Sequence, residues 1–490
     1  NSAEPHNNIG NVLFDQGKLE EAIEAYKKVL SINPLNADAY YNIGNALKEQ
    51  SKLKEALEAY KETLSINPSY IEAYNNIGNT LREHGKIEEA IDTFKKAIKI
   101  KPDYAEAHNN MAIALNEQGQ LLEAINSYNK AICLKPGYDE AFSNLGNALK
   151  GITLYEPIPG LQKSIISLLN KKLHVRPKDI VDLVLSLLKL EGNFQKQLKA
   201  VQGSGIVRNP LKVILDLARL PLLLNLMSVC PISNLETEKL LRQLRAALLL
   251  NISTIKVSPD LLKFQSALAL QCFTNEYIYS HSVDEENSLE DLNAVVKQAL
   301  QTNEQPNSHF VLCLASYRPL TKYDWCNHLL LNNEIKDVLE RQVSEANQEE
   351  KLKSNITSLA AITDKVSSKV RDQYEESPYP RWVNLRLRLK PASISKVFDE
   401  VNLKTYDDKI KEIKAPEILI AGCGTGQHSI GTAARFKDSK VLAIDLSLSS
   451  LSYAKRKTDE LCLSNIDYLQ ADLLDLGKFN MKFDLIESVG

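Results

Sequence analysis

Apolar and small residues return at a fixed interval along the first quarter of the chain. Prolines stand 34 residues apart, at Pro34, Pro68, Pro102 and Pro136. Three further columns follow the same interval: Ala22, Ala56, Ala90 and Ala124; Tyr26, Tyr60, Phe94 and Tyr128; and Gly10, Gly44, Gly78 and Gly146, with Ala112 in the glycine column once. Because proline has no backbone N–H, each proline is expected to end a helix. The pattern predicts repeated pairs of helices.

Each repeat contains the residues that a closely packed helical hairpin needs. Small residues such as Gly44 and Ala56 let two helices approach, and Tyr60 fills the space beside them. Residues that tolerate a positive φ are expected at the turn between the helices, and they stand at Gly17, Ser51, Gly85 and Gly119. This pattern resembles the tetratricopeptide repeat. The resemblance implies an all-α solenoid over residues 3–150, with four units and a capping helix.

Asparagine forms a further column that suggests a binding surface. It recurs in every unit, at Asn8, Asn42, Asn76, Asn110 and Asn144. A side-chain amide offers both a donor and an acceptor, so a stripe of them matches a peptide backbone of any sequence. The stripe resembles the asparagine ladder of the O-linked N-acetylglucosamine transferase superhelix, which implies that the groove binds a protein or peptide. The alternative is that these residues only satisfy neighbouring helices and loops.

Residues 151–370 have a helical pattern without a recognisable catalytic group. Apolar residues recur every three or four positions in Asp179–Leu190, Asn234–Leu250 and Pro259–Gln271. The histidines of this region are isolated from one another, which favours structural roles. We expect a helical middle region.

Residues 371–414 are interpreted as a linker and lead-in segment. Two prolines two positions apart, Pro378 and Pro380, predict extended backbone for Gln373–Val383. The segment resembles the one that precedes the methyltransferase domain in bacterial proteins that join tetratricopeptide repeats to a methyltransferase. That resemblance suggests that Tyr374 or Tyr379 helps to cover an active site; the alternative is a rigid linker.

From residue 415 onward the pattern changes to alternating strands and helices. Glu417–Ala421 is a short apolar run that predicts a buried parallel strand, and it leads into a glycine-rich turn and a helix. Further strands are predicted at Lys440–Ile444, Asp467–Gln470 and Phe483–Glu487. Strand, glycine turn and helix predict a doubly wound, Rossmann-like α/β fold, with a ligand at the carboxyl ends of the strands.

The glycine spacing separates two possible cofactors. A dinucleotide site needs a third small residue at position 427, which is Gln here. The turn instead resembles that of class I S-adenosylmethionine-dependent methyltransferases. The resemblance implies cofactor contacts from residues at the ends of three strands: Gly422, Cys423, Gly424, Thr425, Gly426, Asp445, Leu446, Asp472 and Leu473. Asp445 is expected to bind the ribose hydroxyls, and Asp472 with Leu473 the adenine edge.

The chain departs from the family's pattern at one position, and no residue can be assigned as the catalytic base. The family often has an acidic residue two positions before the first glycine, where this chain has Ile420. Cys423 is expected to be structural, and a capping or packing role is at least as reasonable for His428 as a cofactor contact. Glu487 and Ser488 are candidates to line the cleft, while the catalytic base stays unassigned. The domain is expected to be truncated at its C-terminus.

Composition and charge limit the kinds of partner that this chain is expected to bind. The net charge of −3 argues against a dedicated nucleic-acid coat, which needs a strong basic excess. The seven cysteines contain no C-x-x-C pair, so neither zinc nor a disulfide framework is indicated. No apolar run is long enough for a membrane span. We expect a cytoplasmic protein fragment that uses S-adenosylmethionine, with no metal.

Taken together, the sequence predicts a methyltransferase whose repeats bind a peptide or protein. Two alternatives stay open: a non-enzymatic scaffold with a degenerate methyltransferase fold, and a methyltransferase for a small molecule or glycan that uses its repeats for assembly. The methyl acceptor and the oligomeric state are not specified.

Overall fold

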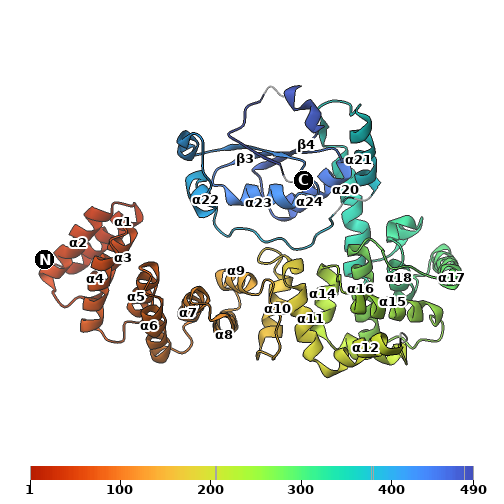
Figure 1. Ribbon diagram of the computed structural model, residues 1–490, viewed down its shortest axis with the longest axis horizontal. Helices are drawn as coiled ribbons and strands as arrows, with labels where there is room; N and C mark the ends of the chain where they lie inside the picture. The colour runs from red at the N-terminus through yellow and green to blue at the C-terminus, as the bar shows by residue number, and fades with distance from the viewer. Residues whose placement is uncertain (1, 205–206, 377, 379, 479–480, 489–490) are drawn as a thin grey trace. The chain divides into compact units, whose positions relative to one another are not determined.

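The repeat pattern of the first unit corresponds to consecutive helical hairpins (Figure 1). The computed structural model describes residues 2–204, 207–376, 378, 380–478 and 481–488. The chain forms two compact units, Asn1–Lys150 with Ile158–Ser164 and Gly151–Pro157 with Ile165–Gly490. The helices of the repeats are α1 (Ala3–Asp15), α2 (Leu19–Ile32), α3 (Ala37–Glu49), α4 (Leu53–Ile66), α5 (Ile71–Glu83), α6 (Ile87–Ile100), α7 (Ala105–Glu117), α8 (Leu121–Leu134) and α9 (Asp139–Ala148).

The glycine and aromatic columns meet inside each hairpin. A Cβ atom on Gly44 would lie 2.6 Å from Cε1 of Tyr60, and one on Gly78 would lie 2.5 Å from Cε1 of Phe94. Both rings are fully buried. The turns between the helices have positive φ, including +62° at Ser51. The predicted solenoid is confirmed, because the small column provides the space that the aromatic column fills.

The second unit begins with helices that pack around an apolar core. Asn234 and Ser258 each accept a hydrogen bond from a backbone N–H in the first turn, so they cap α15 and α16 as their residue types favour. The helices of this region are α10 (Leu161–Asn170), α11 (Val181–Leu190), α12 (Gly192–Ser204), α13 (Pro210–Ala218), α14 (Pro221–Val229), α15 (Leu235–Leu250), α16 (Pro259–Thr274), α17 (Val283–Gln301), α18 (Ser308–Ala315), α19 (Lys336–Leu339) and α20 (Glu345–Lys353). Short 3₁₀ turns lie at Pro177–Asp179, Leu320–Lys322 and Cys326–His328, and a π-helical turn at Glu340–Ser344 joins α19 to α20.

A parallel sheet follows, and it confirms the predicted α/β fold (Figure 1). Its order is β1-β4-β3-β2-β5, so β2 has β3 on one side and β5 on the other. The chain reverses its direction of winding at β2, which is where doubly wound sheets bind ligands. The strands are β1 (Thr357–Ser358), β2 (Glu417–Ala421), β3 (Lys440–Asp445), β4 (Ile466–Gln470) and β5 (Leu485–Ser488).

Apolar residues cluster on both faces of this sheet. Ile418 and Ile420 of β2 belong to one buried cluster, while Leu419 packs with Ile444 and Ala471 in another. The remaining helices of the unit are α21 (Lys365–Glu376), α22 (Ile394–Glu400), α23 (Gln427–Arg435) and α24 (Leu448–Glu460), with 3₁₀ turns at Asp408–Glu412 and Leu473–Lys478. Of these, α22, α23 and α24 contribute to the cluster that contains Ile418 and Ile420. Among the described residues, every helix is too short or too polar to cross a membrane.

One local prediction is wrong. The extended segment predicted from Gln373 starts later, because α21 continues to Glu376. A proline restricts the residue before it but not those further upstream, so Pro378 leaves positions 373–376 free to be helical. The short strand β1, which pairs with β4 through Thr357 and Leu469, was not foreseen from the sequence.

Candidate active site at the carboxyl ends of the strands

The glycine turn between β2 and α23 has backbone angles that favour glycine. Gly422, Gly424 and Gly426 have φ values of +78°, +51° and +86°. The turn is fixed to the neighbouring strand, since the backbone N–H groups of Gly422 and Cys423 donate to the carbonyl oxygen of Ile444 at 3.0 and 2.9 Å. The backbone therefore holds an unusual conformation in a defined position.

The three glycines differ in what surrounds them. A Cβ atom on Gly422 or Gly424 would meet nothing within 4 Å, whereas one on Gly426 would lie 2.6 Å from Cβ of Ala454 on α24. Gly426 thus serves helix packing. Gly422 and Gly424 leave open space at the carboxyl end of β2, where a ligand can approach the backbone closely.

Asp445, at the end of β3, faces the same turn. Its Oδ2 accepts the N–H of Gly424 at 2.8 Å, and its Oδ1 accepts the N–H of Ser447 at 3.0 Å. A carboxylate offers about four acceptor positions, so acceptor capacity remains for a ligand. Burial raises the pKa of Asp445, and the nearby Glu375 adds to the rise, while the backbone donors oppose it. The site suits a ligand that brings hydroxyl donors.

The predicted adenine-binding residues lie in the adjoining loop. The N–H of Ala471 donates to the carbonyl of Asp445 at 3.1 Å, which places the loop after β4 beside the end of β3. Asp472 is buried and accepts the N–H of Leu474 at 3.0 Å, while Leu473 is exposed. The carbonyl of Leu446 accepts from Nε2 of Gln470 at 2.8 Å. The structure therefore gathers the predicted residues at one edge of the sheet.

The side chains of Cys423 and Thr425 point into the protein. Cys423 is buried, its Sγ lies 3.6 Å from the carbonyl oxygen of Gly424, and burial raises the pKa of its thiol well above the ordinary value. The hydroxyl of Thr425 donates to the carbonyl of Pro380 at 2.8 Å. Both residues can therefore offer a ligand mainly their backbone.

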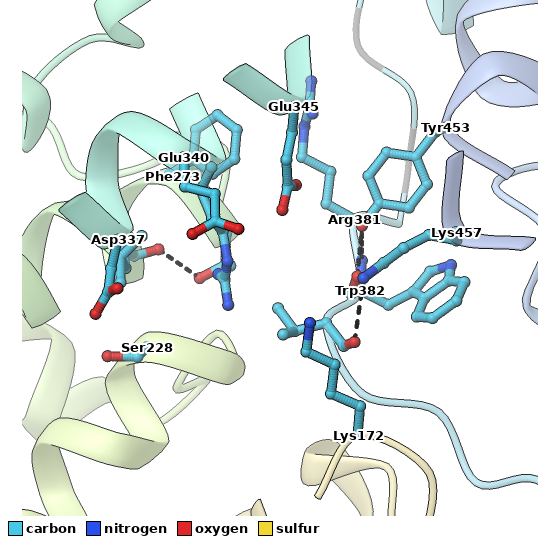
Figure 2. Close-up of a pocket in the computed structure, with 14 residues that line it drawn as sticks. Lys172, Ser228, Phe273, Asp337, Glu340, Glu345, Arg381, Trp382, Tyr453 and Lys457 are labelled. Atoms are coloured by element: carbon cyan, nitrogen blue, oxygen red, sulfur yellow. Dashed lines mark hydrogen bonds between the residues drawn. The ribbon is translucent and has the colours of Figure 1, made fainter. Parts of the chain in front are cut away.

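The lead-in segment is attached to the glycine turn through a tryptophan. Nε1 of Trp382 donates to the carbonyl of Thr425 at 2.9 Å, and its backbone N–H donates to the hydroxyl of Tyr453 at 2.9 Å. Figure 2 shows Trp382, Tyr453 and Lys457 on one side of a small cavity, with Asp337 and Glu340 on the opposite side. No role was assigned to Trp382 from the sequence.

The covering role expected of Tyr374 or Tyr379 stays a prediction. Tyr374 lies on α21 and is partly exposed, and Tyr379 lies outside the described residues. The neighbouring Glu375 accepts hydrogen bonds at the start of α24, from the N–H of Ser449 at 3.2 Å and from its hydroxyl at 2.7 Å. No signal in the sequence pointed to Glu375.

Ile420 stands where the family often has an acidic residue, and it lies in the buried core. Ile420 is 1% exposed, and its neighbour in register on β5 is Glu487. Oε2 of Glu487 lies 2.7 Å from Nε2 of His428 and accepts the hydroxyl of Thr432 at 2.7 Å. Burial raises the pKa of Glu487, but these two partners outweigh it and lower the pKa overall. His428 therefore contacts β5, and Ser488 is exposed.

The asparagine column connects successive repeats. Nδ2 of Asn76 donates to the hydroxyl of Tyr41 at 3.0 Å and to Oδ1 of Asn45 at 2.8 Å. Asn42, Asn110 and Asn144 likewise donate to Asn7, Asn75 and Asn109, each 35 positions earlier. Asn8 is exposed. These bonds show that the amide nitrogens contribute to packing between the units.

Comparison with known proteins identifies both ends of the chain. One model described as TPR repeat matches residues 10–51, 78–119 and 114–151, and two models described as tetratricopeptide repeat match residues 37–70 and 59–92. A model described as methyltransferase domain matches residues 418–490. The chain therefore joins tetratricopeptide repeats to a methyltransferase domain, as the sequence predicted.

Individual relatives share only parts of the chain. A tRNA (guanine-N(7)-)-methyltransferase of Helicobacter pylori is 33% identical over 89 residues, which are 18% of this chain and 22% of that protein. The chain thus matches about a fifth of that relative's length. A MamA structure from Desulfovibrio magneticus is 22% identical, covers 30% of this chain and 82% of its own, and has a TM-score of 0.28. YrrB, described as a TPR protein with an unusual peptide-binding site, is 23% identical, covers 34% and 86%, and has a TM-score of 0.28.

Proposed function

We propose that this chain is an S-adenosylmethionine-dependent methyltransferase whose repeats bind a peptide or protein. The observation that carries the proposal is the combination at the end of β2: open space beside Gly422 and Gly424, and an Asp445 carboxylate with unused acceptor capacity. A backbone without side chains and a carboxylate are what a nucleoside ligand needs on its sugar side.

The residues would divide the work of holding the cofactor. The two ribose hydroxyls would donate to Asp445, and the glycine backbone would lie against the sugar and methionine parts. Asp472 would accept from the adenine amino group, while the N–H of Leu473 would donate to the ring. When bound, the cofactor supplies an activated methyl group, and the protein contributes alignment and electrostatics.

The groove of the repeats would bind the partner peptide or protein. The side-chain amide N–H groups of Asn42 and Asn76 donate to the preceding repeat. Their side-chain carbonyl oxygens are therefore the groups best placed to contact a ligand. Such oxygens accept hydrogen bonds, which a peptide backbone can donate at every residue other than proline. The groove would therefore bind peptides with little regard for their sequence.

Calorimetric titration of the full chain with S-adenosylmethionine tests the cofactor site. We expect saturable binding that Asp445→Ala removes. Asp467→Ala is the matched control, because Asp467 is an exposed carboxylate on the neighbouring strand β4. Equal affinity in Asp445→Ala and the control would contradict the assigned site. No binding by the unchanged chain would favour the non-enzymatic scaffold, which the buried Ile420 keeps open.

Transfer of a labelled methyl group in cell extract tests the substrate class. We expect the label in protein. Label only in small molecules or glycans would support assembly as the role of the repeats, and label in RNA would point to the substrate class named for the Helicobacter relative. The triple variant Asn42→Ala, Asn76→Ala and Asn110→Ala should lose protein capture while its affinity for the cofactor stays unchanged. Loss of both would contradict separate roles for the two ends.

A further inference from the structure

A basic trough lies along α23 in the second unit. It has a volume of about 640 Å³, and its charged lining consists of Arg176, Arg386, Arg388, Arg435, His428 and Glu400. His428 belongs to the first turn of α23, directly after the glycine turn. The trough therefore begins beside the proposed cofactor site and extends along the helix to Arg435.

Main-chain pairing creates this concentration of arginines. The N–H of Leu385 donates to the carbonyl of Lys172 at 2.8 Å, and that of Leu387 donates to the carbonyl of Leu173 at 2.9 Å. Two segments more than 200 positions apart in the chain thus run side by side. The pairing brings Arg386 and Arg388 close to Arg176, although both lie far from Arg176 in the sequence.

Acidic partners compensate only some of these charges. Arg388 forms a two-pronged contact with Glu400 at 2.5 and 2.9 Å, and Nε of Arg176 lies 3.1 Å from Asp179. Arg386 and Arg435 have no ion pair with any residue that the structure describes. Burial and repulsion from Arg176 lower the pKa of Arg386, while attraction to Asp179 opposes them. The trough holds positive charge that an anion would stabilise.

We propose that the basic trough binds an acidic segment of the peptide that is methylated, with Arg386 and Arg435 as the residues that hold its carboxylates. Guanidinium groups bind carboxylates through paired hydrogen bonds. The rest of the wall is uncharged and mostly aliphatic, and the described lining contains no Phe, Tyr or Trp. Single-stranded nucleic acid normally needs aromatic surfaces for its bases, so the lining favours a peptide. This inference rests on the proposed function.

Fluorescence anisotropy with the full chain tests the trough directly. The probe is fluorescein-labelled hexaglutamate, with hexalysine and hexauridylate of matched length for comparison. We expect hexaglutamate to bind best, and the double variant Arg386→Gln, Arg435→Gln to weaken its binding at least about tenfold. The matched control is Lys437→Gln, Lys482→Gln, which removes the same charge from exposed positions outside the trough. The triple asparagine variant of the repeats should bind the probe normally.

Each result decides the proposal. Equal losses in the trough variant and the lysine control would overturn it, as would tighter binding of hexauridylate with loss in the same variant, which would assign the trough to RNA. Failure of the unchanged chain to bind hexaglutamate at low ionic strength would also overturn it. Calorimetry with S-adenosylmethionine separates the two proposals, because the trough variant should keep its cofactor affinity and Asp445→Ala should keep its affinity for the probe.

Discussion

At the scale of single residues, one short turn uses glycine for two different reasons. Gly424 has a positive φ and faces open space, whereas Gly426 has a positive φ and lies against Ala454. The sequence shows only that both are glycine. A side chain at the first position would project into the open space proposed for the cofactor, and one at the second would overlap α24.

This difference predicts that the same substitution has different effects at the two positions. Gly424→Ala should abolish S-adenosylmethionine binding and cost about 1–2 kcal/mol of stability, the cost of placing a side chain in the left-handed region. Gly426→Ala should cost more, because its methyl group overlaps α24 in addition. Urea unfolding combined with calorimetry measures both effects. If both variants lost the same stability, the assignment of Gly426 to packing would be wrong.

Asp445 predicts a dependence of cofactor affinity on pH. Its raised pKa means that the free protein opposes ionisation, and ribose hydroxyls would stabilise the ionised form. Affinity should therefore be highest above this pKa and fall as the pH falls through it, at a pH above the range of an ordinary Asp. Asp445→Asn should bind weakly at every pH. Titrations between pH 4 and 8 check this, and an affinity that is constant over this range would contradict the role of the carboxylate.

At the scale of elements, the repeats were predictable because their rules are local. Each hairpin needs a small residue opposite an aromatic ring, a turn residue with positive φ and a proline after the second helix, and all three recur at the same interval. The C-terminal end of α21, at Glu376, was misjudged because the proline rule was applied too far upstream. Glu375 was missed because its partner, Ser449, lies 74 positions away.

The hairpin geometry makes Gly78 sensitive to one added methyl group. Gly78→Ala should destabilise the repeats by about 1–3 kcal/mol, since the methyl group would overlap the buried ring of Phe94. The combination Gly78→Ala, Phe94→Leu should cost less than the sum of the two single variants. Thermal unfolding followed by circular dichroism gives the comparison. Additive losses would show that the two sites do not share this space.

At the scale of the second unit, buried ion pairs join the helical region to the methyltransferase domain. Arg456 of α24 is 4% exposed in its side chain, and it lies 2.9 Å from Glu345 and 2.8 Å from Glu349 of α20. More than 100 positions separate the partners along the chain. The two regions are therefore expected to unfold together.

Arg456→Met tests this coupling. It should destabilise the second unit by about 3–5 kcal/mol, because two carboxylates would lose their buried partner. Adding Glu345→Gln and Glu349→Gln should restore much of the loss. Urea unfolding of the unchanged chain, the single variant and the triple variant supplies the measurement. A persistent loss in the triple variant would show that Arg456 acts through packing instead of charge.

The ion pairs of Glu460, also on α24, predict how the stability of the second unit responds to acid. Burial raises its pKa, but Lys457 and Lys172 outweigh that effect and lower it to about 2. A lowered pKa stabilises the folded state fully above the ordinary value of 4.5, and this contribution is lost as the pH falls toward 2. Glu460→Gln should therefore lower stability at pH 6 and reduce its decline below pH 4.5. The exposed Glu412→Gln serves as the control, and identical acid profiles would contradict the prediction.

The sequence by itself determined the two ends of this molecule. A recurring interval predicted the solenoid, and a strand, a glycine turn and an acid at the end of the next strand predicted the fold and the edge where Asp445 lies. These signals can be read from the sequence because the residues that create them are near neighbours in the chain. The tertiary structure alone decided that Trp382 and Glu375 support the site, and that Arg176, Arg386 and Arg435 line one trough. Those contacts join distant segments, and packing, not spacing, brings them together.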